Sequence, residues 1–487
     1  MTISVVTAGG RGPTGPVTFR QDRGPWSTPR RLLVLGALAV VLTAALGPVI
    51  ATAASTASAE VTVIGEQAAP QVSVATDLSF ALGDLDAQAA NALLVGAAPA
   101  MASARTAALN TYNQRLAEAD NDLQQAAADG GTDPVAQQVV RTTLNRLATY
   151  QSLVSQALLL SQQGADPIGA PSATVLAHYR DATDLMQTML VSVQQLVDHN
   201  HDILESAYAS DSSGSTMAQL RVAVVGALLV ATLVSIQIQL RRRQRRRLNP
   251  ALLAGTVIAL LVSVLGLTAL GNAASQLYVA KQQAFDSVIA LAEARAVSDD
   301  ANADESRYLL DPQRAEQYQQ AFLAKMQTLA RFGDATDLVS YDGDLATAVQ
   351  QYQVSMVVLF DGYFSTGLTN LTFPNAQNTA KLTFGDFGTY LTADQHLREL
   401  ATSGDRAGAI TFDIGTAPGD SDYAFNAYDS HLAALIQINQ TAYTTAIDDA
   451  RSGLSGWSAP VPIIGALLVV ALLGLGLWPR IAEYRNP

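Results

Sequence analysis

The chain has 487 residues, of which 49% are hydrophobic and 15% charged, with a formal net charge of −13 and no cysteine. The acidic balance disfavours binding to nucleic acid, and without cysteine no disulfide can stabilise a domain. Four apolar runs of 18 or more residues lack Asp, Glu, Lys, Arg and His, and each is long enough to cross ~30 Å of hydrocarbon as a helix. The runs are Leu32–Ala54, Val222–Leu240, Ala251–Leu270 and Val461–Trp478. They predict an all-α, four-pass integral membrane protein.

Arginine indicates which segments face the cytoplasm, because cytoplasmic segments beside membrane spans carry an excess of Lys and Arg. Residues 1–31 hold five Arg and one Asp, residues 241–250 hold six Arg and no acid, and the C-terminal tail holds two Arg and one Glu. The long segments are acidic instead, with 17 acids and 5 bases in 55–217 and 23 acids and 10 bases in 274–458. We therefore expect a plasma-membrane protein with both termini in the cytoplasm and both long segments outside it.

The first apolar run could also be a cleaved signal, because Ala57-Ser58-Ala59 resembles a cleavage site. Signal cores run ~7 to 15 residues and this run is longer, so we expect a retained span. The predicted parts are a disordered basic tail (1–31), span 1 (32–54), a four-helix bundle (55–217), span 2 (218–240), an Arg-rich link (241–250), span 3 (251–273), a second bundle (274–458) with a distal cap (365–421), span 4 (459–478) and a tail (479–487).

Helical patterns fill the first outer segment. One helix should leave the membrane and reach about Gly96, and a second should run from about Ala100 to Ala128. At Asp133-Pro134 the Asp can cap a third helix and the Pro can take its first position. The fourth helix has apolar residues at alternating spacings of four and three, typical of a bundle seam. These residues are Val175, Tyr179, Ala182, Met186, Met189, Val193, Leu196, Asn200 and Ile203.

The second outer segment ends on a similar seam, formed by Leu432, Leu435, Asn439, Tyr443 and Ile447. Asn200 and Asn439 therefore lie at similar heights before their spans. We interpret both as polar contacts that fix the register of the bundles, with ligand contact as the alternative.

The middle of the second segment is less regular. Two helices are expected between Asp311 and Phe364, and residues 365–421 are rich in Gly, Pro, Thr and Asn. We predict that 365–421 caps the far end of the bundle around a short helix from Phe387 to Ala401, with Thr411–Ile414 extended.

The two halves of the sequence resemble each other in their first spans and in the helices that follow these spans. Leu46-Gly47 matches Leu265-Gly266, and Asp84–Leu94 matches Asp299–Leu309 at a similar offset. We interpret this as an internal duplication of a span–bundle–span unit.

Catalytic motifs are missing: the sequence has no Gly-rich phosphate loop, no Gly-x-Ser-x-Gly and no kinase signature. On a helix His199 and His201 point about 200° apart, so they cannot share a metal ion. We predict no enzymatic activity, no catalytic or metal-binding residues and no cofactor.

One polar segment interrupts a helix that should face a core. Continuing the heptad from Ala284, Val288 and Leu291 turns polar side chains toward the bundle axis. Polar groups there must be paired or hydrated, so they predict either an internal network or a surface for a ligand or partner. The candidate residues are Arg295, Ser298, Asp299, Asn302 and Glu305.

The arginines of the link are predicted to fix the topology and to contact anionic lipid headgroups, with docking of a cytoplasmic partner as an additional role. They are Arg241, Arg242, Arg243, Arg245, Arg246 and Arg247.

The order of span, helical bundle and span resembles the periplasmic sensor domains of chemoreceptors and sensor kinases, and Ser298–Ser306 resembles the first-helix motif of such bundles. The doubled form is similar to GlnX-type actinobacterial membrane proteins. That resemblance implies a signalling relay that couples an extracytoplasmic solute-binding lipoprotein, which senses aspartate, glutamate or asparagine, to a cytosolic serine/threonine kinase.

Only about 50 residues are predicted to be cytoplasmic, too few for a catalytic domain, so the output is expected to pass to another protein. A direct chemoreceptor-like sensor of a small ligand and a cell-envelope scaffold without ligand are the alternatives. The oligomeric state is left open, and a homodimer is one option.

Overall fold

The computed structural model describes residues 28–244, 249–333 and 335–482. Within these ranges all regular secondary structure is helical, apart from one isolated β-bridge between Arg331 and Asp361. Among the described residues four helices are long and apolar enough to cross a membrane, which confirms the predicted fold class. The described chain forms two compact units. We call 28–50, 221–265 and 459–482 the membrane unit, and 51–220 and 266–458 the bundle unit.

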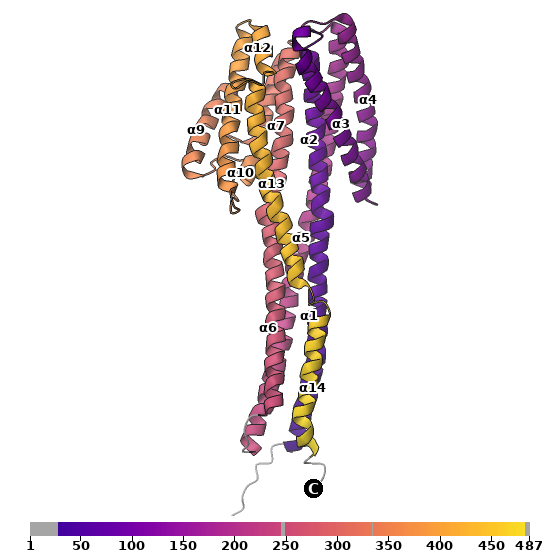
Figure 1. Ribbon diagram of the computed structural model, residues 1–487, viewed down its shortest axis with the longest axis vertical. Helices are drawn as coiled ribbons and strands as arrows, with labels where there is room; N and C mark the ends of the chain where they lie inside the picture. The colour runs from indigo at the N-terminus through magenta and orange to yellow at the C-terminus, as the bar shows by residue number, and fades with distance from the viewer. Residues whose placement is uncertain (1–27, 245–248, 334, 483–487) are drawn as a thin grey trace, which may run out of the picture. The chain divides into compact units, whose positions relative to one another are not determined.

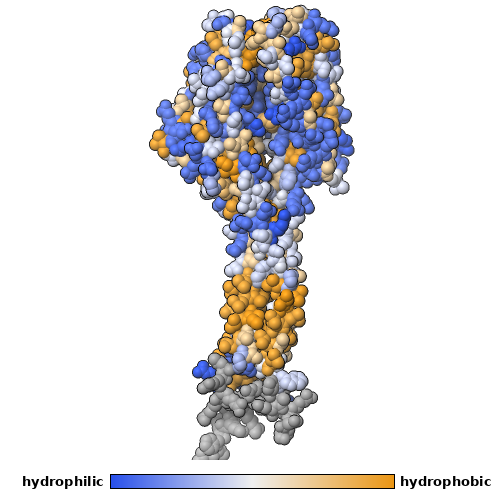
Figure 2. Space-filling model, viewed as in Figure 1, coloured by the Kyte–Doolittle hydropathy of each residue, from blue (hydrophilic) through white to orange (hydrophobic). Residues whose placement is uncertain are grey.

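The membrane unit is built from parts of α1 (Thr28–Thr62), α5 (Ala173–Gln244) and α6 (Pro250–Tyr278), together with α14 (Pro460–Ala482). Exposed leucine and valine side chains cover these helices and form the apolar band in Figure 2. Small residues allow close packing, because a Cβ atom on Gly226 would lie 2.6 Å from Ser263 Oγ. Asn249 donates to the carbonyl of Gly476 at 2.9 Å and so links α6 to α14.

The first half of the bundle unit covers residues 51–220. Its elements after α1 are the π-helix η1 (Val63–Ala68), α2 (Ala69–Leu94), the 3-10 helix η2 (Pro99–Met101), α3 (Ala102–Asp129), α4 (Pro134–Gly164) and the first part of α5. As predicted, Pro134 opens α4, and the Asp133 side chain accepts a hydrogen bond from the Val135 amide at 2.8 Å.

The second half covers residues 266–458. Its elements after α6 are the π-helix η3 (Val279–Phe285), α7 (Asp286–Leu310), α8 (Ala315–Leu329), α9 (Leu338–Ser355), α10 (Tyr363–Gly367), α11 (Ala376–Thr402), α12 (Arg406–Asp413) and α13 (Ser421–Leu454). The π-helices occupy corresponding places, since each joins a helix of the membrane unit to the first bundle helix of its half.

Helices α2 and α7 pack side by side and join the two halves into one compact unit (Figure 1). The core of the first half contains buried apolar residues of the second, among them Leu309, Leu310, Leu397 and Ile410. The core of the second half is aromatic: the Phe364 and Phe387 rings lie 5.1 Å apart, and Phe387 and Tyr428 lie 5.4 Å apart. This packing holds polar side chains of α2 and α7 close together.

The segment 365–421 is more helical than expected. The helix predicted from Phe387 to Ala401 is part of α11, which is 27 residues long and packs against α13. The extended conformation predicted for Thr411–Ile414 is wrong, because most of this stretch is the end of α12. The Asp405 side chain accepts a hydrogen bond from the Gly408 amide at 2.9 Å, which caps α12 and starts a helix there.

The predicted seam of α5 is buried from Val175 to Asn200, but Ile203 is 39% exposed and Leu204 is fully buried in its place. A straight α-helix has 3.6 residues per turn, so a strict heptad drifts around it, and the buried stripe moves by one residue after several turns.

Candidate functional site

A polar cavity of about 510 Å³ lies between the two halves of the bundle unit. We call it the interhalf cavity. Its polar walls come from α2, α3, α7, α13 and the loop before α13, so both halves contribute. The polar residues that line it are Asp84, Gln88, Asn91, Ser103, Thr111, Arg115, Asp299, Asn302, Thr416, Asp422, Asn426 and Asp429.

Two arginines at this cavity are already neutralised by carboxylates. Arg295 binds Asp429 through two hydrogen bonds of 2.5 and 2.8 Å. Arg115 pairs with Asp84 at 2.6 Å and with Glu118 at 2.6 Å. Both guanidinium groups also lie against the Phe80 ring, at 4.2 Å for Arg295 and 4.6 Å for Arg115. Paired and stacked guanidinium groups of this kind are held rigidly.

Two aspartates at the cavity have no such partner. Asp299 is 6% exposed, and no described residue forms a hydrogen bond with its Oδ2 atom. Burial raises the pKa of Asp299 well above its usual value; the carboxylates of Asp429 and Asp84 raise it further, and Arg295 and Arg115 lower it by less. Burial likewise raises the pKa of Asp422, helped by the nearby carboxylates of Asp413 and Asp84. The cavity therefore carries a surplus of acidic groups.

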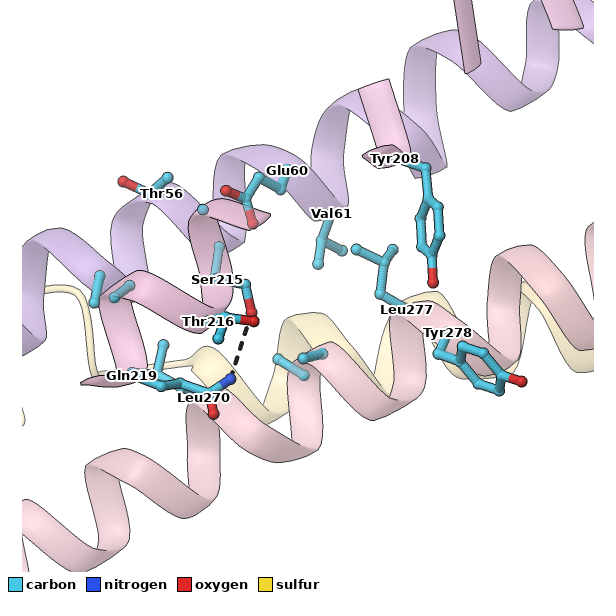
Figure 3. Close-up of a pocket in the computed structure, with 16 residues that line it drawn as sticks. Thr56, Glu60, Val61, Tyr208, Ser215, Thr216, Gln219, Leu270, Leu277 and Tyr278 are labelled. Carbon is cyan, nitrogen blue, oxygen red and sulfur yellow. Dashed lines mark hydrogen bonds between the residues drawn. The ribbon is translucent and has the colours of Figure 1, made fainter. Parts of the chain in front are cut away.

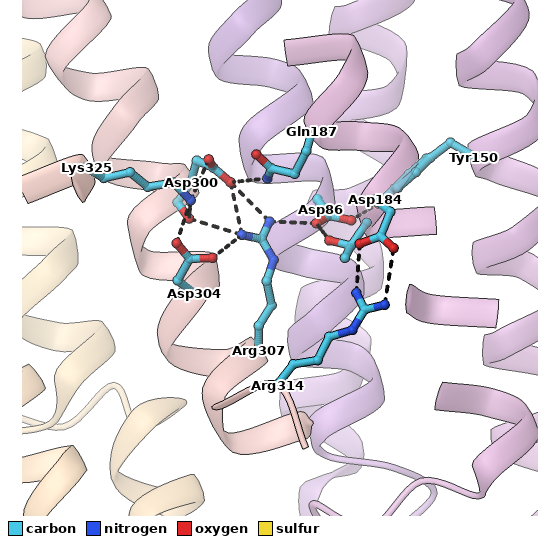
Figure 4. Close-up of polar contacts among 10 residues, drawn as sticks. Asp86, Tyr150, Asp184, Gln187, Asp300, Asp304, Arg307, Arg314 and Lys325 are labelled. Carbon is cyan, nitrogen blue, oxygen red and sulfur yellow. Dashed lines mark hydrogen bonds and ion pairs between the residues drawn. The ribbon is translucent and has the colours of Figure 1, made fainter. Parts of the chain in front are cut away.

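A buried ionic cluster on α7 ties the halves together (Figure 4). The Arg307 side chain is 1% exposed and contacts Asp86 at 2.6 Å, Asp304 at 2.5 Å and Asp300 at 3.1 Å. Lys325 of α8 contacts both Asp300 and Asp304 at 2.6 Å. Burial alone would raise the pKa of Asp300, but Lys325 and Arg307 lower it to about 2. Each of these three carboxyl groups is paired with a basic side chain, which is the arrangement of a structural network.

The carboxylate of Asp86 anchors this cluster to the first half. It accepts hydrogen bonds from the Tyr150 hydroxyl at 2.8 Å and from Thr183, so α2, α4 and α5 meet at one side chain. At the exposed edge, Arg314 pairs with Asp184 of α5 at 2.8 Å (Figure 4).

The five residues predicted on α7 separate into two groups. Asp299 and Asn302 line the interhalf cavity, and Arg295 lies beside it through its pair with Asp429. The other two face the core of the second half. Ser298 shares a 2.7 Å hydrogen bond with the Tyr428 hydroxyl, and fully buried Glu305 accepts one from Ser421 at 3.1 Å.

Sequence reasoning did not identify the cavity residues on α2, α3 and α13. One signal was available for α2, because Asp84 is the residue that matches Asp299 in the predicted duplication. The pairing of Arg115 with Asp84, and the approach of α13, depend on packing between distant segments and leave no local pattern.

The two seam asparagines make different contacts. Asn200 donates to the Gln71 carbonyl of α2 at 3.0 Å, a contact between helices. Asn439 donates to the Leu435 carbonyl of its own helix at 2.9 Å, and none of the described residues bonds to its Oδ1 atom.

The arginines of the link are only partly described. Arg241 and Arg242 are exposed near the end of α5, and Arg243 belongs to the same helix. Arg245, Arg246 and Arg247 lie outside the described residues. The disordered tail predicted at 1–31 and the tail at 479–487 lie mostly outside them too.

A second cavity, of about 270 Å³, lies between α1, α5 and α6 within the bundle unit (Figure 3). Its walls are mainly apolar and include Val61, Leu270 and Leu277, with the Tyr208 and Tyr278 rings at one end. It lacks the surplus of acidic groups found at the interhalf cavity.

Residues 60–209, which form most of the first half of the bundle unit, match the family model described as the actinobacterial sensor domain. No curated protein and no solved structure matches the chain. The match supports an actinobacterial sensor protein, and with four candidate spans it supports a multi-pass membrane protein with a sensing or signalling role.

Proposed function

We propose that this protein is a transmembrane sensor: its bundle unit receives a signal outside the cytoplasm, and its helices pass that signal to a cytoplasmic partner. The observation that carries the proposal is the interhalf cavity, because residues of both α2 and α7 line it. Each of these helices continues through a π-helix into a helix of the membrane unit.

The physical mechanism is a shift between two arrangements of α2 and α7. A ligand changes such an equilibrium only if it binds one arrangement more tightly. Because both helices line the cavity, a shift between them changes its shape, and this gives a ligand a basis for that preference. Shifts of ~1–2 Å between packed helices are a known form of signal at helical interfaces. The π-helices η1 and η3 support the idea, since such segments are rare and occur often at functional sites.

The partners follow from the resemblance to GlnX-type proteins. We propose a solute-binding lipoprotein on the outside and a serine/threonine kinase in the cytoplasm, with the arginines of the link contacting anionic lipid and the kinase. The interhalf cavity also favours a second form of input, in which the bundle unit binds a small ligand directly. Input from a lipoprotein and input from a directly bound ligand would both act through α2 and α7.

Orientation is tested by labelling single cysteines, because the native sequence contains none. Val354→Cys places a thiol at an 87% exposed position of the bundle unit, and Arg242→Cys places one at the exposed end of α5. In intact cells a membrane-impermeant maleimide should label the first variant and label the second only after lysis. The opposite pattern would invert the proposed topology.

Transmission is tested with an environment-sensitive fluorophore on Arg242→Cys in the full chain in nanodiscs. A ligand that occupies the interhalf cavity should change the emission of this fluorophore, and the same fluorophore at Val354→Cys serves as the matched control.

Crosslinking in native membranes followed by mass spectrometry tests the partners. Recovery of a solute-binding lipoprotein and a kinase would support the relay, whereas a scaffold should give neither these partners nor a ligand-dependent signal.

A further inference from the structure

We propose that the interhalf cavity binds a small organic cation, of the diamine or polyamine class, whose ammonium groups neutralise the unpaired aspartates Asp299 and Asp422. The inference rests on the proposed function for its biological meaning, but the binding it predicts can be measured separately.

The charge balance of the cavity carries the argument. Four aspartates line it together with one arginine, Arg115, and Arg295 lies beside it. Arg295 is occupied by Asp429, and Arg115 by Asp84 and Glu118. Asp299 and Asp422 form no ion pair with a described residue, so they are the carboxyl groups of the cavity that an ammonium group of a ligand can pair with.

The position of Asp299 adds a second, independent observation. This side chain is 94% buried by area, lines the cavity, and has an oxygen that no described residue contacts by a hydrogen bond. A buried acceptor without a donor is costly, and an ammonium group supplies up to three donors together with the missing charge. The neighbouring Asn302 and Asn426 amides can orient the rest of the ligand.

Other ligand classes fit less well. An acidic amino acid such as aspartate or glutamate would add negative charge beside unpaired carboxylates, and both arginines that could hold it are occupied. Among the described residues no group of three or more His, Cys, Asp or Glu side chains is arranged to hold a metal ion. A cavity of about 510 Å³ suits a ligand of several heavy atoms, and its polar walls suit an amine.

The test is titration calorimetry on the full chain in nanodiscs, with 1,4-diaminobutane, spermidine, glutamine and glutamate as probes. The diamine and spermidine should bind and glutamate should not. Asp299→Asn and Asp422→Asn should each weaken diamine binding by about ten-fold or more, since each removes a charge-assisted hydrogen bond. Asp344→Asn, which removes the same charge from an exposed site on α9, should leave binding unchanged.

Several outcomes would overturn the ligand class. These are absence of amine binding to the natural chain, amine binding that survives both cavity substitutions, and glutamate binding that is lost in Arg115→Gln. Asn302→Leu narrows the cavity and removes a polar contact without changing the charge, so it should also weaken binding. The helical circular dichroism of each variant should match that of the natural chain, which separates lost binding from misfolding. If the diamine binds as predicted but the fluorophore at Arg242→Cys does not respond, the ligand class stands and the proposed signalling function fails.

Discussion

Replacing Arg307 with methionine should destabilise the bundle unit by about 3–5 kcal/mol. The guanidinium is 1% exposed and contacts three carboxylates, those of Asp86, Asp300 and Asp304. Methionine keeps much of the side-chain volume, so the loss is electrostatic rather than a packing cavity. Lys325 still contacts Asp300 and Asp304 but supplies only one positive charge for the two, and Asp86 keeps only the hydroxyl donors Tyr150 and Thr183.

The assay is thermal unfolding in nanodiscs, followed by circular dichroism at the helical minimum. For a unit of about 360 residues, each kcal/mol corresponds to roughly 1 to 2 °C, so the melting temperature should fall by about 3–10 °C. Asp86→Asn in the Arg307→Met background should recover part of the loss, because a neutral amide does not need a buried counterion.

The matched control is Arg314→Met. Arg314, which directly precedes α8, also forms an ion pair between the halves, with Asp184 of α5. The Arg314 and Asp184 side chains are 28% and 56% exposed, however. Exposed ion pairs contribute little, so this variant should lose less than about 1 kcal/mol. Equal losses for the two arginine variants would refute the reasoning from burial, and so would a loss below about 1 kcal/mol for Arg307→Met.

Two further predictions concern pH and span packing. Burial raises the pKa of both Asp413 and Asp342 to about 7, from 3.8 in the unfolded chain, so their contribution to stability is complete below pH ~4 and is lost as the pH rises through 7. The melting temperature should therefore be higher at pH 5 than at pH 8, and Asp413→Asn with Asp342→Asn should reduce the difference; a higher value at pH 8 would contradict this. In the membrane unit, Gly226→Ala should cost about 1–3 kcal/mol because its Cβ would lie 2.6 Å from Ser263 Oγ, whereas Gly474→Ala, with no atom within 4 Å, should be neutral in the same melting assay.

Much of the architecture followed from local patterns. Long apolar runs predicted the spans, and the spacing from Val175 to Asn200 predicted the buried face of α5. The Asp133-Pro134 pair predicted the start of α4. Local signals failed around residue 411, where β-branched and aromatic residues suggested an extended piece and the cap at Asp405 started a helix.

The polar segment on α7 shows where sequence reasoning stopped. Its heptad indicated that polar groups face the interior, but Asp299 faces the interhalf cavity while Glu305 faces the aromatic core of the second half. A helix that packs on several sides has more than one interior face. Which neighbour each face meets cannot be deduced from the helix alone.

The sequence by itself determined the helical class, the four candidate spans and the acidic character of the long segments, because these depend on residue type and short-range spacing. Only the tertiary structure decided that Asp84 and Asp299 line one cavity, that both nearby arginines are already neutralised, and that Arg307 is buried among three carboxylates. Those facts depend on contacts between residues that are far apart in the chain. Periodicity gives the direction in which a side chain points from its helix, and only packing determines which residues it meets there.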